Sequence, residues 1–184
     1  GQECFYVISS DEDSVTMLAK YNLEVGSVCT SDISCTPIEN PSGIQDSEMI
    51  GRPSDNSYPR RGITAFSSST QKGTNYSDYN GSILEGYVND YKNIIENEYN
   101  LDVKDARLIT IDELISEDIG CSVSNNTCSD APSFITSTSY WTGSAVNEIL
   151  IWDVYSSGGL REEHYSVPYA LGVRPVIVIS KSYF

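Results

Sequence analysis

The last third of the chain, residues 134–184, carries the pattern that decides the fold. It contains the segments Phe134-Ile135-Thr136-Ser137-Thr138-Ser139-Tyr140-Trp141-Thr142-Gly143-Ser144-Ala145, Ile149-Leu150-Ile151-Trp152-Asp153-Val154-Tyr155 and Leu171-Gly172-Val173-Arg174-Pro175-Val176-Ile177-Val178-Ile179-Ser180. Aromatic and β-branched residues are frequent in all three, and the turn residues Ser156-Ser157-Gly158-Gly159 follow the second. Such runs are typical of strands. We therefore predict strands here, with both tryptophans of the chain in or beside them.

The first 23 residues predict a hairpin. Strands over residues 4–8 and 15–23 flank an acidic turn at residues 9–14. From residue 24 to residue 82 four prolines and a Ser/Thr run remove any periodicity. We expect long loops in that region, with one short strand near residues 63–66.

A first helix is expected directly after this region. Ser82 and Glu85 form an S-x-x-E capping box, which is typical of a helix start. Apolar residues then recur at helical spacing on one face over about four turns, as expected for a helix packed on a sheet. The residues of this face are Leu84, Tyr87, Val88, Tyr91, Ile94 and Ile95.

A second, shorter helix has a more complete start signal. Thr110 and Glu113 form another capping box, and Ile109 can contact Leu114 as a hydrophobic staple. Gly120 is predicted to end the helix. A strand or turn over residues 106–109 leads into it.

The composition favours one folded domain over residues 1–184. A length of 184 residues and a hydrophobic content of 39% are sufficient for a substantial core. The net charge of −15 would repel phosphate backbones and anionic lipid, so nucleic acid is not expected as a partner. No apolar run approaches the roughly 18 residues of a membrane helix, so no membrane insertion is expected. The densest acidic group, Asp11-Glu12-Asp13, is more typical of a solvated surface than of a calcium site.

The cysteines predict an oxidising compartment. They are Cys4, Cys29, Cys35, Cys121 and Cys128. The absence of a C-x-x-C pair, together with a single histidine, gives no reason to expect a metal site or a cofactor. The short spacings predict at least one disulfide, first Cys121–Cys128 and then Cys29–Cys35, with buried free thiols as the alternative. Because five is odd, one cysteine is left over or pairs elsewhere.

In chain order the elements predict an α+β fold with an N-terminal hairpin, two helices and a small mixed or antiparallel sheet with long loops. The segments Arg107-Leu108-Ile109-Thr110-Ile111-Asp112-Glu113, Tyr140-Trp141-Thr142-Gly143-Ser144 and Gly172-Val173-Arg174-Pro175-Val176, with Trp152 between the last two, carry a resemblance. They resemble bacterial surface domains related to the C-type-lectin-like fold of the formylglycine-generating (sulfatase-modifying) proteins. The resemblance covers residues 82–184 and implies a compact α+β domain whose long loops carry the binding residues.

Two departures from that family bear on activity. Formylglycine-generating enzymes use cysteines in the C-terminal part of the fold, whereas this chain has none after Cys128, which argues against an oxidase. Calcium-dependent lectins carry Trp-Asn-Asp motifs, and Trp152-Asp153-Val154 is the nearest approach here. His164, in Arg161-Glu162-Glu163-His164-Tyr165, is predicted to lie in an exposed charged loop, so a catalytic role is not expected. We therefore do not expect an enzyme, and the alternative among enzymes is an oxidase of the sulfatase-modifying kind.

The resemblance and the Tyr/Ser/Asn/Gly-rich loops favour a non-catalytic, extracellular or cell-surface module that binds a carbohydrate or a protein. The residues expected to line its binding face are Asn147, Glu148, Asp153, Tyr155 and Arg161. The alternative function is a structural, pilin-like or adhesin subunit of a bacterial surface assembly, for which the leftover cysteine argues.

Three further residues are expected to be structural. Core packing is the expected role of Trp141 and Trp152, with stacking on a sugar or a partner as the alternative. Arg174 lies between strand residues and is expected to brace the last strand against loop carbonyls or a carboxylate. Its alternative role is that of an anchor for an anionic ligand.

Overall fold

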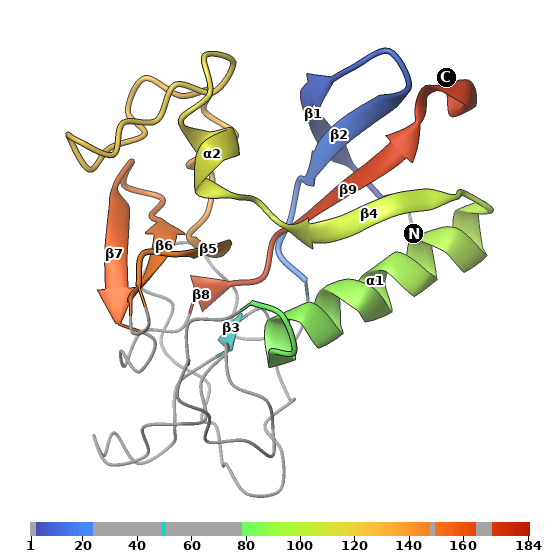
Figure 1. The fold of residues 1–184 in the computed structure, drawn as a ribbon, viewed down its shortest axis with the longest axis horizontal. Helices are drawn as coiled ribbons and strands as arrows, with labels where there is room; N and C mark the ends of the chain where they lie inside the picture. The colour runs from blue at the N-terminus through green and yellow to red at the C-terminus, as the bar shows by residue number, and fades with distance from the viewer. Residues whose placement is uncertain (1–2, 24–48, 51–78, 148–149, 165–170) are drawn as a thin grey trace, which may run out of the picture.

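The computed structural model describes residues 3–23, 49–50, 79–147, 150–164 and 171–184. In chain order its elements are β1 (Phe5–Ser10), β2 (Ser14–Ala19), β3 (Met49–Ile50), α1 (Ile83–Tyr99), β4 (Val103–Leu108), α2 (Ile111–Leu114), β5 (Tyr140–Ala145), β6 (Leu150–Val154), β7 (Leu160–His164), β8 (Leu171–Gly172), β9 (Pro175–Ser180) and the 3-10 helix η3 (Lys181–Tyr183). The strands form two sheets that lie side by side, rather than the one small sheet that was predicted (Figure 1). The α+β class is confirmed, and the described ranges contain the predicted opening hairpin and two α-helices.

The first sheet has the strand order β1-β2-β9-β4, and all its neighbouring strands are antiparallel. Asp11 shapes the turn of its opening hairpin. The Asp11 carboxylate accepts hydrogen bonds from the N–H groups of Asp13 (2.8 Å) and Ser14 (2.7 Å), as in an Asx turn. A bond from the Ser14 hydroxyl, followed by these backbone bonds, holds the pKa of Asp11 below its usual value. Asp11 therefore serves as a turn former.

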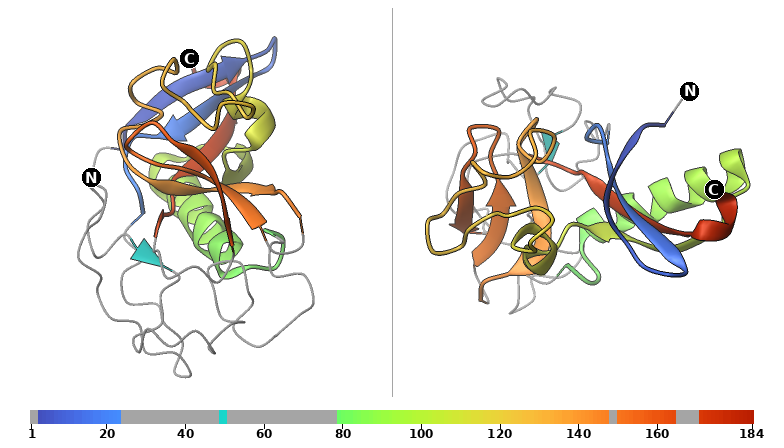
Figure 2. Two further views of the ribbon diagram at one scale, coloured as in Figure 1. Left: turned by 90° about the vertical axis from the view of Figure 1, so that its left-hand side faces the viewer. Right: turned by 90° about the horizontal axis from the view of Figure 1, so that it is seen from above.

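Helix α1 covers one face of the first sheet (Figures 1 and 2). The Ser82 hydroxyl caps the helix by accepting a hydrogen bond from the N–H of Glu85, as predicted. The Glu85 carboxylate accepts from the N–H of Gly81 instead of completing the capping box at Ser82. Ile95 is 1% exposed, whereas Ile94, predicted on the same face, is 47% exposed because one residue turns a helix by about 100°. Among the described residues, no helix is long and apolar enough to cross a membrane.

Helix α2 joins the two sheets. Its capping box between Thr110 and Glu113 is present as predicted. Both carboxylate oxygens of Glu113 also accept hydrogen bonds from Arg107 of β4, each at 2.7 Å. On the other side, the N–H of Ile111 donates to the Ser144 hydroxyl of β5 (2.9 Å). The helix thus links a strand of the first sheet to a strand of the second.

The second sheet has the strand order β3-β8-β5-β6-β7, with β5 parallel to β8 and the other pairs antiparallel. Its two faces belong to different apolar clusters. Trp141, on β5, is 2% exposed and packs in a cluster with Leu84 and Val88 of α1. Trp152, on β6, is 6% exposed and belongs to a cluster with Leu114 of α2. Both faces of this sheet are therefore covered.

Several predicted boundaries were wrong. Residues 134–139 form turns instead of the first half of a strand, and residues 171–180 are divided into β8 and β9 by Val173 and Arg174. This break occurs where the Arg174 side chain enters the core and where Pro175 has no N–H to donate. Helix α2 ends at Leu114, before the predicted stop at Gly120. The segment predicted as an exposed loop before His164 is strand β7, and the strand predicted at residues 63–66 lies outside the described residues.

Candidate functional site

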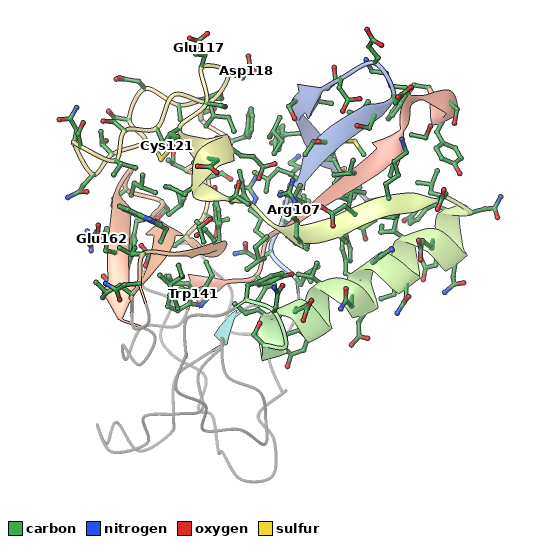
Figure 3. The ribbon with its side chains drawn as sticks, viewed as in Figure 1. Arg107, Glu117, Asp118, Cys121, Trp141 and Glu162 are labelled. Atoms are coloured by element: carbon green, nitrogen blue, oxygen red, sulfur yellow. A yellow bond between two sulfur atoms is a disulfide. The ribbon has the colours of Figure 1, made fainter. Side chains whose placement is uncertain are left out.

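Strand β6 brings a group of polar and aromatic side chains to one face of the second sheet. The register places Asp153 of β6 between Trp141 of β5 and Arg161 of β7. Directly paired residues on neighbouring strands point to the same side of a sheet. This is the side that packs against the start of α1, and Figure 3 shows Trp141 in that position. Glu162 pairs with Trp152 and therefore belongs to the opposite face.

Asp153 is the unusual member of this group. Its side chain is 0% exposed, and neither carboxylate oxygen has a hydrogen-bond partner within the described part of the chain. Burial, and then the charge of Glu163, raise the pKa of Asp153 to about 9, although Arg161 acts in the opposite direction. Asp153 is therefore a neutral carboxylic acid at pH 7. A buried polar group without a partner is rare in a folded protein and needs a specific explanation.

Arg161 and Tyr155 form a stacked pair beside Asp153. The guanidinium carbon of Arg161 lies 4.2 Å from the centre of the Tyr155 ring, within the range of a cation–π contact. Arg161 is exposed and Tyr155 is half-buried. Glu163, two residues further along β7, lies on the same face as Arg161, and burial raises its pKa while Arg161 lowers it. We name Trp141, Asp153, Tyr155, Arg161 and Glu163 the Asp153 cluster.

The structure brings together only part of the predicted binding face. Asp153, Tyr155 and Arg161 lie in the Asp153 cluster. Asn147 lies at the opposite end of β6, in the link from β5, where its side-chain oxygen accepts a hydrogen bond from the N–H of Leu150 (3.0 Å). Glu148 lies outside the described residues. The predicted residues therefore do not form one continuous face.

The sequence interpretation missed Glu163 as a member of the site, and it expected core packing for Trp141, with stacking on a sugar or a partner as the alternative. A signal for Glu163 was present, because residues two apart on a strand share a face and Arg161 was already a candidate. This signal was not used because residues 161–165 were predicted as a loop, and side chains alternate between two faces only in a strand. The pairing of Trp141 with Asp153 depends on the register of β5 and β6, which contains an irregularity between Trp141 and Ala145.

Arg174 lies fully buried near the junction of the two sheets. Its guanidinium donates hydrogen bonds to the carbonyl oxygens of Ala19 (2.7 Å), Phe134 (2.7 Å) and Ile135 (3.4 Å). The guanidinium carbon also lies 5.1 Å from the centre of the Tyr140 ring. Burial lowers the pKa of Arg174, and Tyr140 opposes that shift. This arginine binds carbonyls from two distant segments, which fits a bracing role.

Cys121 and Cys128 form the predicted disulfide, and both are buried. Cys4 is free, whereas Cys29 and Cys35 lie outside the described residues. Within the described ranges, no group of three or more His, Cys, Asp and Glu residues is arranged to hold a metal ion.

The Asp153 cluster combines aromatic surface, an exposed cation and a carboxylic acid that can both donate and accept a hydrogen bond. Ligand sites use such groups to orient a polar molecule against apolar surface. Arg161 is the exposed member of this pair, and the buried Asp153 lies beside it on the neighbouring strand. Comparison of the chain with protein-family models, with curated proteins and with solved structures found no match.

Proposed function

We propose that this chain is a C-type-lectin-like, non-catalytic binding module displayed outside the cell, which recognises a carbohydrate or a protein ligand through the Asp153 cluster. The order of the elements supports this proposal, since a hairpin, two helices and a Trp-containing strand precede a closing strand, β9, that pairs with the opening hairpin. The buried Cys121–Cys128 disulfide supports an oxidising, extracytoplasmic compartment.

The observation that carries the proposal is the buried carboxyl of Asp153, which has no hydrogen-bond partner among the residues that the structure describes. Removing such a group from water without a compensating hydrogen bond destabilises a fold. Fold stability therefore does not explain an acid at this position. Groups that conflict with stability and have strongly shifted pKa values concentrate at functional sites, which is why we assign the binding face to this end of β6.

The chemistry of the cluster suits a hydroxyl-rich ligand. Sugar hydroxyls both donate and accept hydrogen bonds, and Arg161 offers several donors at the surface. The Tyr155 ring supplies the aromatic surface on which a sugar ring or an apolar side chain can pack. A protein ligand would use the same groups, since Tyr and Arg are frequent in the energetic centres of protein interfaces.

The direct test is a glycan-array screen of the purified chain, with and without Ca²⁺. Saturable binding that does not depend on Ca²⁺ is the expected result. Loss of binding on chelation would show that a calcium site, not the Asp153 cluster alone, holds the ligand. Silence across a broad array would remove carbohydrate as the ligand and would favour a structural role in a surface assembly.

Variants then locate the site. Arg161→Ala should weaken binding about tenfold or more, as expected for a central interface arginine. The matched control is Glu162→Ala, which removes an exposed neighbour on the opposite face of β7 and should leave binding unchanged. Asn147→Ala, at the other end of β6, should also bind normally. Equal loss in all three variants would place the ligand elsewhere.

A further inference from the structure

The disulfide loop, Cys121–Cys128, lies against the link between β6 and β7. The N–H of Cys128 donates a hydrogen bond to the carbonyl oxygen of Gly158 at 2.7 Å. The hydroxyl of Thr127 donates to the same oxygen at 3.2 Å. One carbonyl of the β6–β7 link is thus held by two donors from the loop.

Two further contacts extend this attachment into β7. The N–H of Leu160, the first residue of β7, donates to the carbonyl oxygen of Asn126 at 3.1 Å. Thr127 also forms an isolated antiparallel bridge with Gly159. The loop therefore contacts three consecutive residues, Gly158, Gly159 and Leu160, although the bonded residues are 30 or more positions apart in sequence.

The disulfide loop has a defined shape of its own. Ser122 and Thr127 exchange backbone hydrogen bonds of 2.7 and 3.1 Å across it, and Asn126 has a left-handed backbone with φ of 50°. Cys128 is 1% exposed and belongs to the same apolar cluster as Leu160. The loop therefore has a defined conformation, and Cys128 anchors it in the apolar core.

The link that the loop supports begins at Tyr155 and leads into β7, whose second residue is Arg161, the exposed partner of Tyr155 in the Asp153 cluster. Tyr155 donates its N–H to Gly159 (2.8 Å) and accepts from the N–H of Gly158 (2.9 Å). A Cβ added to Gly159 would lie 3.3 Å from Nε of Arg161, so the Arg161 side chain lies close over the link. Movement of the link would therefore change the position of Arg161 relative to Tyr155.

We propose that the disulfide loop positions the β6–β7 link, with Thr127 as its main positioning residue, and that ligand binding by Tyr155 and Arg161 requires the closed loop. Reduction would consume two electrons and two protons from a dithiol, which itself becomes a disulfide, and would leave thiols on Cys121 and Cys128. The consequence for binding rests on the proposed function, whereas the coupling between loop and link does not.

Hydrogen exchange of backbone amides tests the coupling without any ligand. Thr127→Val keeps the shape but removes the hydroxyl, which donates to Gly158 and accepts from the N–H of Ser129 (3.0 Å). It should speed exchange at Leu160 and Tyr155 about fivefold, as expected for the loss of the bond to the link. Thr127→Ser keeps the hydroxyl and should restore slow exchange. Ser124→Ala alters an exposed hydroxyl that bonds only within the loop in the described structure, and serves as the matched control.

Reduction with dithiothreitol, or a Cys121→Ser/Cys128→Ser variant, should give a larger change of about tenfold or more at the same amides. Faster exchange throughout the chain, or no change at Leu160 and Tyr155 in Thr127→Val, would overturn the coupling.

Measuring the affinity of the Thr127 variants for the ligand found in the binding screen distinguishes the proposed function from the proposed coupling between loop and link. If Thr127→Val exchanges faster at the link and binds more weakly, while Thr127→Ser does neither, the positioning role is supported. If the link loosens but affinity is unchanged, the requirement of the closed loop for binding is wrong. If the wild-type chain binds no ligand in the screen while the exchange results hold, the proposed function fails and the coupling stands.

Discussion

Asp153 in the second sheet and Arg174 at the border of that sheet are both completely buried, and the surroundings of these two side chains differ sharply. Arg174 donates to the carbonyl oxygens of Ala19, Phe134 and Ile135, so its hydrogen-bonding groups are used by the fold. Asp153 has no hydrogen-bond partner among the described residues. A buried ionisable group with partners is explained by structure, whereas one for which the described residues offer no partner indicates a function that stability does not require. The contrast separates a bracing residue from a candidate binding residue.

The largest effect should come from removing the buried cation. Arg174→Met removes the donor that Arg174 supplies to the carbonyl oxygens of Ala19 and Phe134, and we expect the free energy of unfolding to fall by about 3 kcal/mol or more. Urea unfolding followed by circular dichroism measures this change. The same substitution at the exposed Arg161 should alter stability by no more than about 0.5 kcal/mol. Equal effects at the two positions would remove the distinction between them.

The next effect should appear in the pH dependence of stability. The pKa of Asp153 is about 9 in the folded chain and near 4 in the unfolded chain, so the folded state retains a proton that the unfolded state releases. Stability from this group is complete below about pH 4 and is lost as pH rises toward 9, by up to about 1.4 kcal/mol per pH unit.

Asp153→Asn should remove that slope. The variant should match the wild type near pH 4 and exceed it increasingly at pH 6, 7 and 8 in urea unfolding. Glu162→Gln, an exposed change on the neighbouring strand, should leave the slope in place. Parallel stability curves for the wild type and Asp153→Asn would show that Asp153 is ionised in the folded chain and has partners after all.

A third change tests how the end of the opening hairpin docks onto the second sheet. A Cβ on Gly172 of β8 would collide with the side-chain amide of Asn22, which is buried and bonded to the Thr138 hydroxyl (2.9 Å). Gly172→Ala should therefore lower the free energy of unfolding by about 1–3 kcal/mol. Gly86→Ala in α1, where a Cβ meets open space, should raise it by about 0.5–1 kcal/mol. Destabilisation by both changes would contradict this steric account.

The smallest effect should have a pH dependence opposite to that of Asp153. Burial disfavours ionised Glu113, but hydrogen bonds from Arg107 and Thr110 hold the pKa of Glu113 below its usual value. Its contribution is therefore present above about pH 4.5 and is lost as pH falls. Glu113→Gln should lower the free energy of unfolding by about 1 kcal/mol at pH 7 and by less at pH 3, as measured by urea unfolding. A loss that is equally large at pH 3 would indicate that the charge of Glu113 contributes nothing.

Much of the local structure could be predicted from the sequence. The hairpin turn, the cap at Ser82, the capping box at Thr110 and the Cys121–Cys128 pair were all recognised correctly. Each of these features depends on residues within about ten positions of one another, so their chemistry can be read from spacing alone.

The candidate site was predicted only in part. Asp153, Tyr155 and Arg161 were chosen because of their types and their place near a turn, and the structure brings them together. The separation of Asn147 from this group was not foreseen. Asn147 precedes β6 and Tyr155 follows it, so the length of the strand lies between them. The role of β7 was missed because a short charged strand at the edge of a sheet lacks the apolar alternation that identifies strands.

By itself, the sequence determined the α+β class, the helix starts, the opening hairpin and the short disulfide, since these depend on neighbouring residues. Only the tertiary structure decided that Arg174 would meet carbonyls 155 and 40 residues away, and that Asp153 would be buried with no hydrogen-bond partner in the described ranges of the chain. The physical reason is that burial and hydrogen-bond partnership arise when distant segments pack together. An arginine and an aspartate at these two positions could equally have been exposed to solvent if the distant segments had packed differently.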